Sequence, residues 1–150
     1  MVVEVAAMLR AATADDAAAI AELATQLGYP VAADVMATRL ENLPAETEAV
    51  VVATIAGAVR AWMQVGVALS IESQPFVEIR GLVVDADLRA SGLGTQLVEF
   101  AKSWAQAKQV SSLRVRSNVV RTATHAFYEK RGFIVSKSQK VFTFALPQAD

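Results

Sequence analysis

Residues 78–97 read EIRGLVVDADLRASGLGTQL, and this stretch decides the fold of the chain. A short apolar run at 82–84 is followed by a polar break and by a loop with Gly92 and Gly94, after which apolar residues recur at helical spacing. A strand, a glycine loop and a helix start in this order leave backbone N–H groups free at the positive end of the helix dipole. Such groups bind a phosphate or pyrophosphate. The stretch therefore predicts an anion site at a strand-to-helix turn.

The remaining sequence extends this unit into a single α/β domain over residues 1–150. Residues 70–75 are predicted to form a loop. The strand 76–84, the helix 92–108 and the strand 112–117 form a βαβ unit, and its right-handed crossover makes the two strands parallel. Periodicity and turn residues predict helices over 13–26, 32–42, 92–108 and 121–131, and strands over 8–11, 48–55, 58–67, 76–84, 112–117, 133–136 and 140–146.

Composition excludes several classes of function. The chain has 150 residues and no cysteine, which excludes a disulfide framework, a thiolate zinc site and a cysteine nucleophile. Fourteen basic and fifteen acidic residues give a net charge of −1, so no general attraction to nucleic acid or to an anionic membrane is expected. No apolar run approaches the roughly 20 residues of a membrane span, and the start lacks the pattern of a signal peptide. We therefore expect a cytoplasmic protein without a nucleic-acid or membrane partner.

The glycine loop does not match two common nucleotide motifs. A Walker A loop requires Gly-Lys-Ser/Thr, but Gly94 is followed by Thr95 and Gln96. A Rossmann fingerprint requires a small third residue where Leu97 stands. Taken by itself, a loop with two glycines also fits a turn that binds nothing.

A second motif lies at residues 118–133, NVVRTATHAFYEKRGF. On a helix, Ala123 and Phe127 share one face, so Phe127 packs inward while the Tyr128 hydroxyl reaches the edge of the sheet. A hydroxyl in that place is able to give up a proton. The alternative is an amphipathic tyrosine at the boundary of the core.

The two motifs together, in this order and about 25 residues apart, resemble those of the GNAT superfamily of acetyl-CoA-dependent N-acetyltransferases. The resemblance covers nearly the whole chain. It implies an α/β (α+β) fold, with a mixed, mostly antiparallel sheet of six to seven strands flanked by four helices. The fourth and fifth strands are expected to be parallel and splayed, with the acyl-CoA in the V between them.

The resemblance also implies a role for each matching residue. Backbone groups of Leu82, Val83 and Val84 would pair with the pantetheine arm and the acetyl carbonyl. Asn118 would bind the pantetheine, and Tyr128 would protonate the departing thiolate. Phe127 is included in the cofactor-binding set. Arg121 is included as well, because it opens the helix beside Asn118 and is the best placed arginine for a basic rim that binds the CoA 3′-phosphate; a solvated position is the alternative. The pyrophosphate would be held by the loop Arg89, Ala90, Ser91, Gly92, Leu93, Gly94 and Thr95.

The attacking amine must lose a proton, which requires a base or an ordered water. Glu78 is the predicted base because it stands where some members of the family carry a catalytic glutamate on this strand. Strand alternation also puts Arg80 on the same face, so an ion pair between the two is the alternative. His125 ranks below Glu78, since a contact on the helix surface or at the edge of the cofactor suits it better. Other positions considered are Arg114 and Arg116 as a basic rim, and Trp62 and Tyr29 as walls of the acceptor pocket.

The predicted function is transfer of an acetyl group from acetyl-CoA to a primary amine of a small molecule or peptide, by direct attack in a ternary complex and without a metal. Two alternatives remain. One is a regulatory module that binds acyl-CoA without turnover, and the other is an acyltransferase that uses a longer acyl-CoA. A homodimer is considered because dimers are common in the family. The amine acceptor is not predicted from the sequence.

Overall fold

Residues 6–117 and 121–149 are described by a computed structural model. Contacts between Cα atoms divide the chain into two units, Met1–Arg116 and Ser117–Asp150, and each is described by itself. No helix in the described part of the chain is long and apolar enough to cross a membrane.

The first unit is built on a five-stranded sheet with the order β1-β2-β3-β4-β5. Neighbouring strands are antiparallel from β1 to β4, whereas β4 and β5 are parallel. The predicted βαβ unit, with parallel strands on either side of a long helix, is therefore confirmed. The strands are β1 (Met8–Ala11), β2 (Glu48–Ile55), β3 (Ala58–Ser70), β4 (Ser73–Val84) and β5 (Leu113–Val115).

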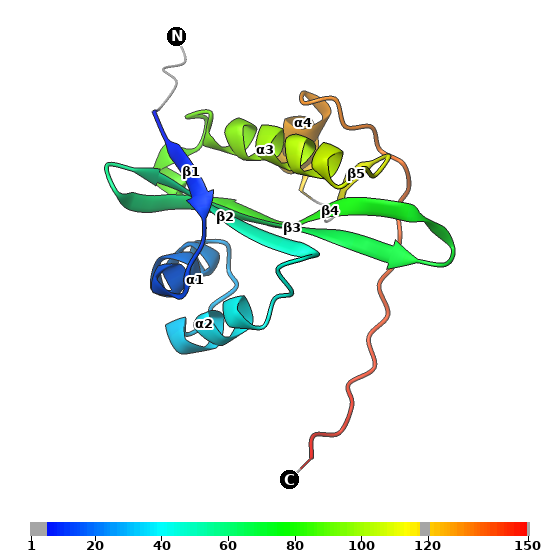
Figure 1. Cartoon of the computed structure of the whole chain (residues 1–150), viewed down its shortest axis with the longest axis horizontal. Helices are drawn as coiled ribbons and strands as arrows, with labels where there is room; N and C mark the ends of the chain where they lie inside the picture. Colours follow the sequence, from blue (N-terminus) through cyan, green and yellow to red (C-terminus); the bar gives the residue numbers. More distant parts are fainter. Residues whose placement is uncertain (1–5, 118–120, 150) are drawn as a thin grey trace. The chain divides into compact units, whose positions relative to one another are not determined.

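Helices cover both faces of this sheet. Figure 1 shows α1 and α2 on one face and α3 on the other. The predicted loop over 70–75 is wrong, because β3 and β4 form a hairpin in which Ser70 pairs with Ser73 and only two residues form the turn. The helices are α1 (Ala17–Gln26), α2 (Ala33–Glu41) and α3 (Leu93–Ala107), with short 3₁₀ turns η1 (Ala14–Asp16) and η2 (Ala86–Leu88).

The core forms two layers because side chains alternate between the faces of the strands. Met63 and Val65 of β3 are fully buried on the face that α3 covers, as are Leu93 and Leu97 of α3. On the opposite face, Ile20 of α1 is buried. Helix α3 packs on β2, β3, β4 and β5, and this packing fixes the position of its first turn at the end of β4.

An ion pair joins β1 to the start of the first helix. Both guanidinium nitrogens of Arg10 donate to the Asp16 carboxylate, at 2.7 and 2.9 Å, and the Thr13 backbone N–H donates to the same group at 2.8 Å. The hydrogen bond from Arg10 is the main cause that lowers the pKa of Asp16. Thr13 is the N-cap of the 3₁₀ turn at 14–16, as predicted, and the α-helix itself begins one turn later, at Ala17.

The second unit contains α4 (Thr122–Glu129) followed by an extended segment. The predicted strands 133–136 and 140–146 are wrong here, because residues 133–149 form no strand. The described residues thus give a five-stranded sheet instead of six to seven strands. Val141, Phe142 and Phe144 favour extended backbone, but they are exposed. A high β-propensity sets the local conformation and does not supply a neighbouring strand.

Candidate active site

The far end of β4 has one edge without a partner strand. The last pair between β4 and β5 joins Ile79 to Val115, while β4 continues to Val84. On its other edge, β4 stays paired with β3 as far as Val84 and Ala61. In the described residues the two parallel strands therefore separate beyond Ile79, and five residues of β4 have one open edge.

The register identifies which backbone groups face this open edge. Asp85 donates its N–H to the Arg60 carbonyl next to β3, at 2.9 Å. Because backbone groups alternate sides along a strand, those of Val83 and Gly81 also face β3. Those of Leu82 and Val84 face the open edge. The register shifts between Gln64 and Val65, because β4 has one extra residue there, Arg80, which pairs with no residue of β3. The alternation described here applies to the part of β4 that follows Arg80.

The loop after β4 ends in a helix start that no side chain caps. Gly92 is the N-cap of α3, with a φ of 94°, and it has no side chain to offer. The first backbone hydrogen bond recorded there runs from Gln96 N–H to the Gly92 carbonyl, at 3.0 Å. The preceding N–H groups of Leu93 and Gly94 thus point out of the first turn. This end of α3 has the features of an anion site.

Two further residues shape the loop. Asp85 accepts the Asp87 N–H at 3.1 Å and the Arg60 Nε–H at 3.0 Å, and these bonds, the first above all, lower the pKa of Asp85. Ser91 is only 8% exposed, and its hydroxyl has no hydrogen-bond partner among the described residues. A buried hydroxyl without a partner is costly, so this loop holds an unused polar group close to the helix start.

Glu78 lies in a network of charges on the face of the sheet that α1 and α2 cover. The residue Glu78 is 8% exposed. Its carboxylate accepts hydrogen bonds from Arg80 Nη1 at 2.9 Å and from Arg116 Nε at 3.1 Å. Arg80 also binds Glu48 of β2 at 2.8 Å, and this bond is the main cause that raises the pKa of Arg80. The ion pair between Glu78 and Arg80 that strand alternation suggested is therefore present.

A glycine makes room for this network. Glu48, Gly66 and Glu78 stand side by side across three strands, since Gly66 pairs with both glutamates. A Cβ atom at Gly66 would collide with the Glu48 carboxylate, which therefore lies directly over the Gly66 backbone. Gln64 Nε2 donates to the same carboxylate at 2.9 Å. Glu48 and Gln64 were not among the predicted site residues, although their alternation along two neighbouring strands was a usable signal.

Tyr128 belongs to the second unit, on the last turn of α4. It is 9% exposed, and burial raises the pKa of its phenol to about 12, an effect that Arg131 partly opposes. Its ring makes edge contacts with Phe127 and Phe133, at centroid distances of 5.0 and 5.3 Å. The Arg131 guanidinium lies over the Phe127 ring at 3.7 Å. The phenol is thus held in a fixed orientation and stays protonated at neutral pH.

The predicted site residues fall into four groups, the first of which is Glu78 in the ion-pair network on β4. Residues 82–84 and 89–95 lie together at the end of β4 and the start of α3. Arg121, His125, Phe127 and Tyr128 lie on or next to α4. Asn118 lies outside the described residues. Within the described part of the chain, no group of three His, Cys, Asp or Glu side chains is placed to hold a metal ion.

Of the two residues predicted as pocket walls, Trp62 lines a cavity and Tyr29 does not. Trp62 lines a cavity of about 430 Å³ between β2, β3 and the helices α1 and α2. Tyr29 is 61% exposed and is not among the residues that line this cavity. The Trp62 ring lies over Gly81 of β4, where a Cβ atom would come within 2.9 Å of it. Trp62 therefore connects the cavity to the strand with the open edge.

Comparison with known proteins agrees with this geometry. An aminoglycoside 6'-N-acetyltransferase from Acinetobacter haemolyticus has a similar fold, with a TM-score of 0.80 and 17% identity over 93% of this chain and 99% of that one. An acetyltransferase from Trypanosoma brucei and a transcriptional regulator from Bacillus halodurans each have a TM-score of 0.78 and 19% identity, over 93% of this chain and 100% of theirs. No curated protein sequence matches the chain significantly. The profile of the Acetyltransferase (GNAT) family matches residues 15–133, and the chain therefore belongs to this family.

Proposed function

We propose that this protein transfers an acetyl group from acetyl-CoA to a primary amine of a small molecule or peptide, by direct attack in a ternary complex. The observation that carries the proposal is the continuity of the open edge of β4 with the uncapped start of α3. An open strand edge pairs with an amide-containing arm, and a helix start binds a pyrophosphate. Pantetheine and pyrophosphate are joined in CoA in the same way.

The residues present fit the cofactor. The N–H groups of the loop 89–95, with the Ser91 hydroxyl nearby and the Arg89 side chain adding charge, would hold the pyrophosphate. Of the three β4 residues predicted to pair with the pantetheine arm, Leu82 and Val84 direct their backbone groups to the open edge, while those of Val83 face β3. We assign the pantetheine contacts to those two residues. Asn118, Arg121 and Phe127 keep their predicted roles as further contacts of the cofactor.

Acetyl-CoA supplies the activated acetyl group as a thioester. The backbone N–H of β4 that faces its carbonyl would polarise it, and positioning would provide most of the acceleration. Glu78 is proposed to receive the amine proton, directly or through a water. Its carboxylate accepts hydrogen bonds from Arg80 and Arg116, which hold it in place on β4. Tyr128 is proposed to donate its proton to the leaving sulfur. Overall, a C–N bond forms, the C–S bond breaks, and the products are an acetamide and the CoA thiol.

Release of CoA thiol from acetyl-CoA, measured over a broad panel of primary amines, tests this proposal. We expect thiol release with at least one amine and a decrease of kcat of about 100- to 10,000-fold in Tyr128→Phe, as for loss of a general acid. Tyr29→Phe is the matched control and should leave kcat unchanged. Thermal stabilisation by acetyl-CoA without release for any amine would instead indicate a binding module. An acetylated enzyme with ping-pong kinetics would contradict direct attack.

A further inference from the structure

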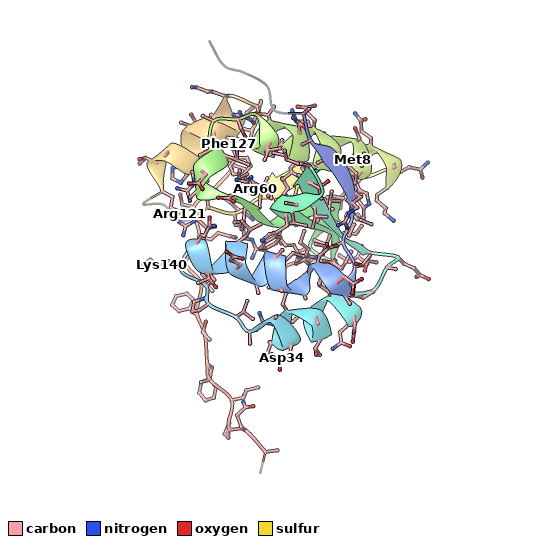
Figure 2. The ribbon with its side chains drawn as sticks, turned by 90° about the vertical axis from the view of Figure 1, so that its left-hand side faces the viewer. Met8, Asp34, Arg60, Arg121, Phe127 and Lys140 are labelled. Carbon is pink, nitrogen blue, oxygen red and sulfur yellow. The ribbon has the colours of Figure 1, made fainter. Side chains whose placement is uncertain are left out.

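The cavity beneath α2 has the size and shape of a small-molecule site. It measures about 430 Å³, within the range of ligand pockets. Its apolar walls come from both helices and both central strands, and they are Ile20, Met36, Leu40, Leu43, Val50 and Trp62. Figure 2 shows α1 and α2 side by side on the same side of the sheet. The cavity therefore lies between two helices and a sheet face and is partly open to solvent.

The roof of this cavity is incompletely packed. Helix α2 has no buried residue, and its inward-facing Met36 and Leu40 are only half-buried. Because this apolar face of α2 borders a cavity and not packed side chains, part of its apolar surface stays accessible to water. The apolar part of a ligand would complete this layer, so the walls favour a compact hydrocarbon body.

The only charged side chain that lines the cavity is positive. Arg39 of α2 lines it together with the amides of Asn42 and Gln64. Among the described residues, Arg39 has no ion-pair partner. Of the acidic residues of α2, Asp34 lies away from the sheet in Figure 2, and Glu41 lines a neighbouring pocket and not this cavity. An anionic group on the ligand would therefore find a free guanidinium.

The acid on the sheet side of the cavity, Glu48, is not free to bind a cation. Glu48 is two residues from the lining residue Val50, but its carboxylate already accepts Arg80 and Gln64. A polycationic ligand would need unpaired carboxylates, as the like-charged Arg39 would repel it. Gln64 uses its Nε2 on Glu48, which leaves its amide oxygen as an acceptor for an N–H group.

The cavity also adjoins the reacting end of β4. Gln64 pairs directly with Gly81, the residue before Leu82, and Trp62 lies over the same glycine. The cavity thus lies between α2 and the strand whose open edge is assigned to the acetyl donor.

We propose that the acetyl acceptor is a small primary amine that combines an apolar body with a carboxylate, as an amino acid with an aliphatic side chain does, and that Arg39 binds the carboxylate. This inference rests on the proposed acetyltransfer function. In the step, the amine nitrogen forms a bond to the acetyl carbon and loses one proton, while the sulfur leaves as the CoA thiol. Polycations such as the aminoglycosides named for one structural neighbour are poor acceptors by the same argument.

A matched set of acceptors tests the proposal in the full-length protein. L-leucine is compared with L-leucinamide and 3-methylbutylamine, which lack the carboxylate, and with spermidine and kanamycin. Arg39→Gln is expected to lower kcat/KM for leucine about 10- to 100-fold, the usual effect of losing a charge-assisted bond, and to leave the value for 3-methylbutylamine within about twofold. Arg39→Lys should recover part of the loss. Lys102→Gln, on α3 across the sheet, is the control.

Calorimetric titration with N-acetylleucine provides a second readout that needs no turnover. We expect binding that Arg39→Gln weakens by a similar factor. Preference for spermidine, kanamycin or 3-methylbutylamine, or an equal effect of Arg39→Gln on charged and uncharged acceptors, would overturn the acceptor class while leaving acetyltransfer intact. Absence of thiol release with every amine would contradict the proposed function, and Arg39-dependent binding of N-acetylleucine would then still support the pocket assignment. Absence of such binding overturns it.

Discussion

Ala90 is a residue whose backbone conformation costs stability. Its φ of 66° lies in the left-handed region, where a Cβ atom costs about 1–2 kcal/mol, and a glycine avoids that cost at an entropic cost of about 0.5–1 kcal/mol. We therefore expect Ala90→Gly to raise the free energy of unfolding by up to about 1 kcal/mol in urea titration. Ala86→Gly, in the same loop at negative φ, should lower it. A loss of stability in both variants would contradict the argument.

The buried phenol of Tyr128 should make stability depend on pH in the alkaline range. Its pKa is about 12 in the folded protein and about 10 when unfolded, so above pH 10 the unfolded state loses the proton first. Stability from this group is complete below pH 10 and falls as the pH rises from 10 towards 12, by about 1 kcal/mol at pH 11. Urea titrations at pH 8 and pH 11 measure the difference.

Tyr128→Phe should reduce this alkaline loss, and the exposed Tyr29→Phe should not. The same pKa implies that Tyr128 remains protonated over the pH range of an ordinary activity assay. An alkaline decline of kcat below pH 10 would then have another cause. An equal reduction of the loss in both variants would refute the assignment to the buried phenol.

At the scale of single elements, β4 is the strand on which the proposed cofactor site depends. Val84→Pro removes one N–H from the open edge, and Val83→Pro removes one that faces β3. We expect Val84→Pro to raise the Kd for acetyl-CoA at least tenfold while the fold persists, and Val83→Pro to lower the melting temperature more. Val84→Ala, which keeps the N–H, should bind acetyl-CoA within about twofold of the wild type. If Val84→Pro binds acetyl-CoA with the Kd of the wild type, the Val84 backbone does not contact the pantetheine arm.

Elements with strong periodicity and clear end signals were predicted well from the sequence. The helix at 93–107 and the strands of the central hairpin are formed close to their predicted bounds, and the parallel pairing followed from the handedness of the crossover. The strands predicted at 133–136 and 140–146 are absent, because a high local β-propensity does not determine which strand a segment pairs with. The network of Glu48, Arg80 and Glu78 depends on Gly66 of a third strand, so no single segment of the sequence contained it.

For the molecule as a whole, the prediction of one domain over residues 1–150 has a direct test. A single domain of this size unfolds in one cooperative transition. We expect circular dichroism of the whole chain and hydrogen exchange of α4 to report the same urea midpoint. Saturating acetyl-CoA, at about 100 times its Kd, should raise the unfolding free energy by about 2.7 kcal/mol in both measurements. Separate midpoints would show that Met1–Arg116 and Ser117–Asp150 are independent folding units.

The position of Trp62 also gives the protein an internal optical reporter. Its indole lines the cavity, and the indole N–H has no hydrogen-bond partner among the described residues. A ligand that enters the cavity will change the polarity around the ring. The emission wavelength and the intensity of Trp62 fluorescence should therefore change on binding. Trp104 lies on α3, with Lys108 Nζ at 4.9 Å from its ring, on the other side of the sheet. We therefore expect Trp62 to report on ligands in the proposed acceptor pocket, with Trp104 as an internal reference.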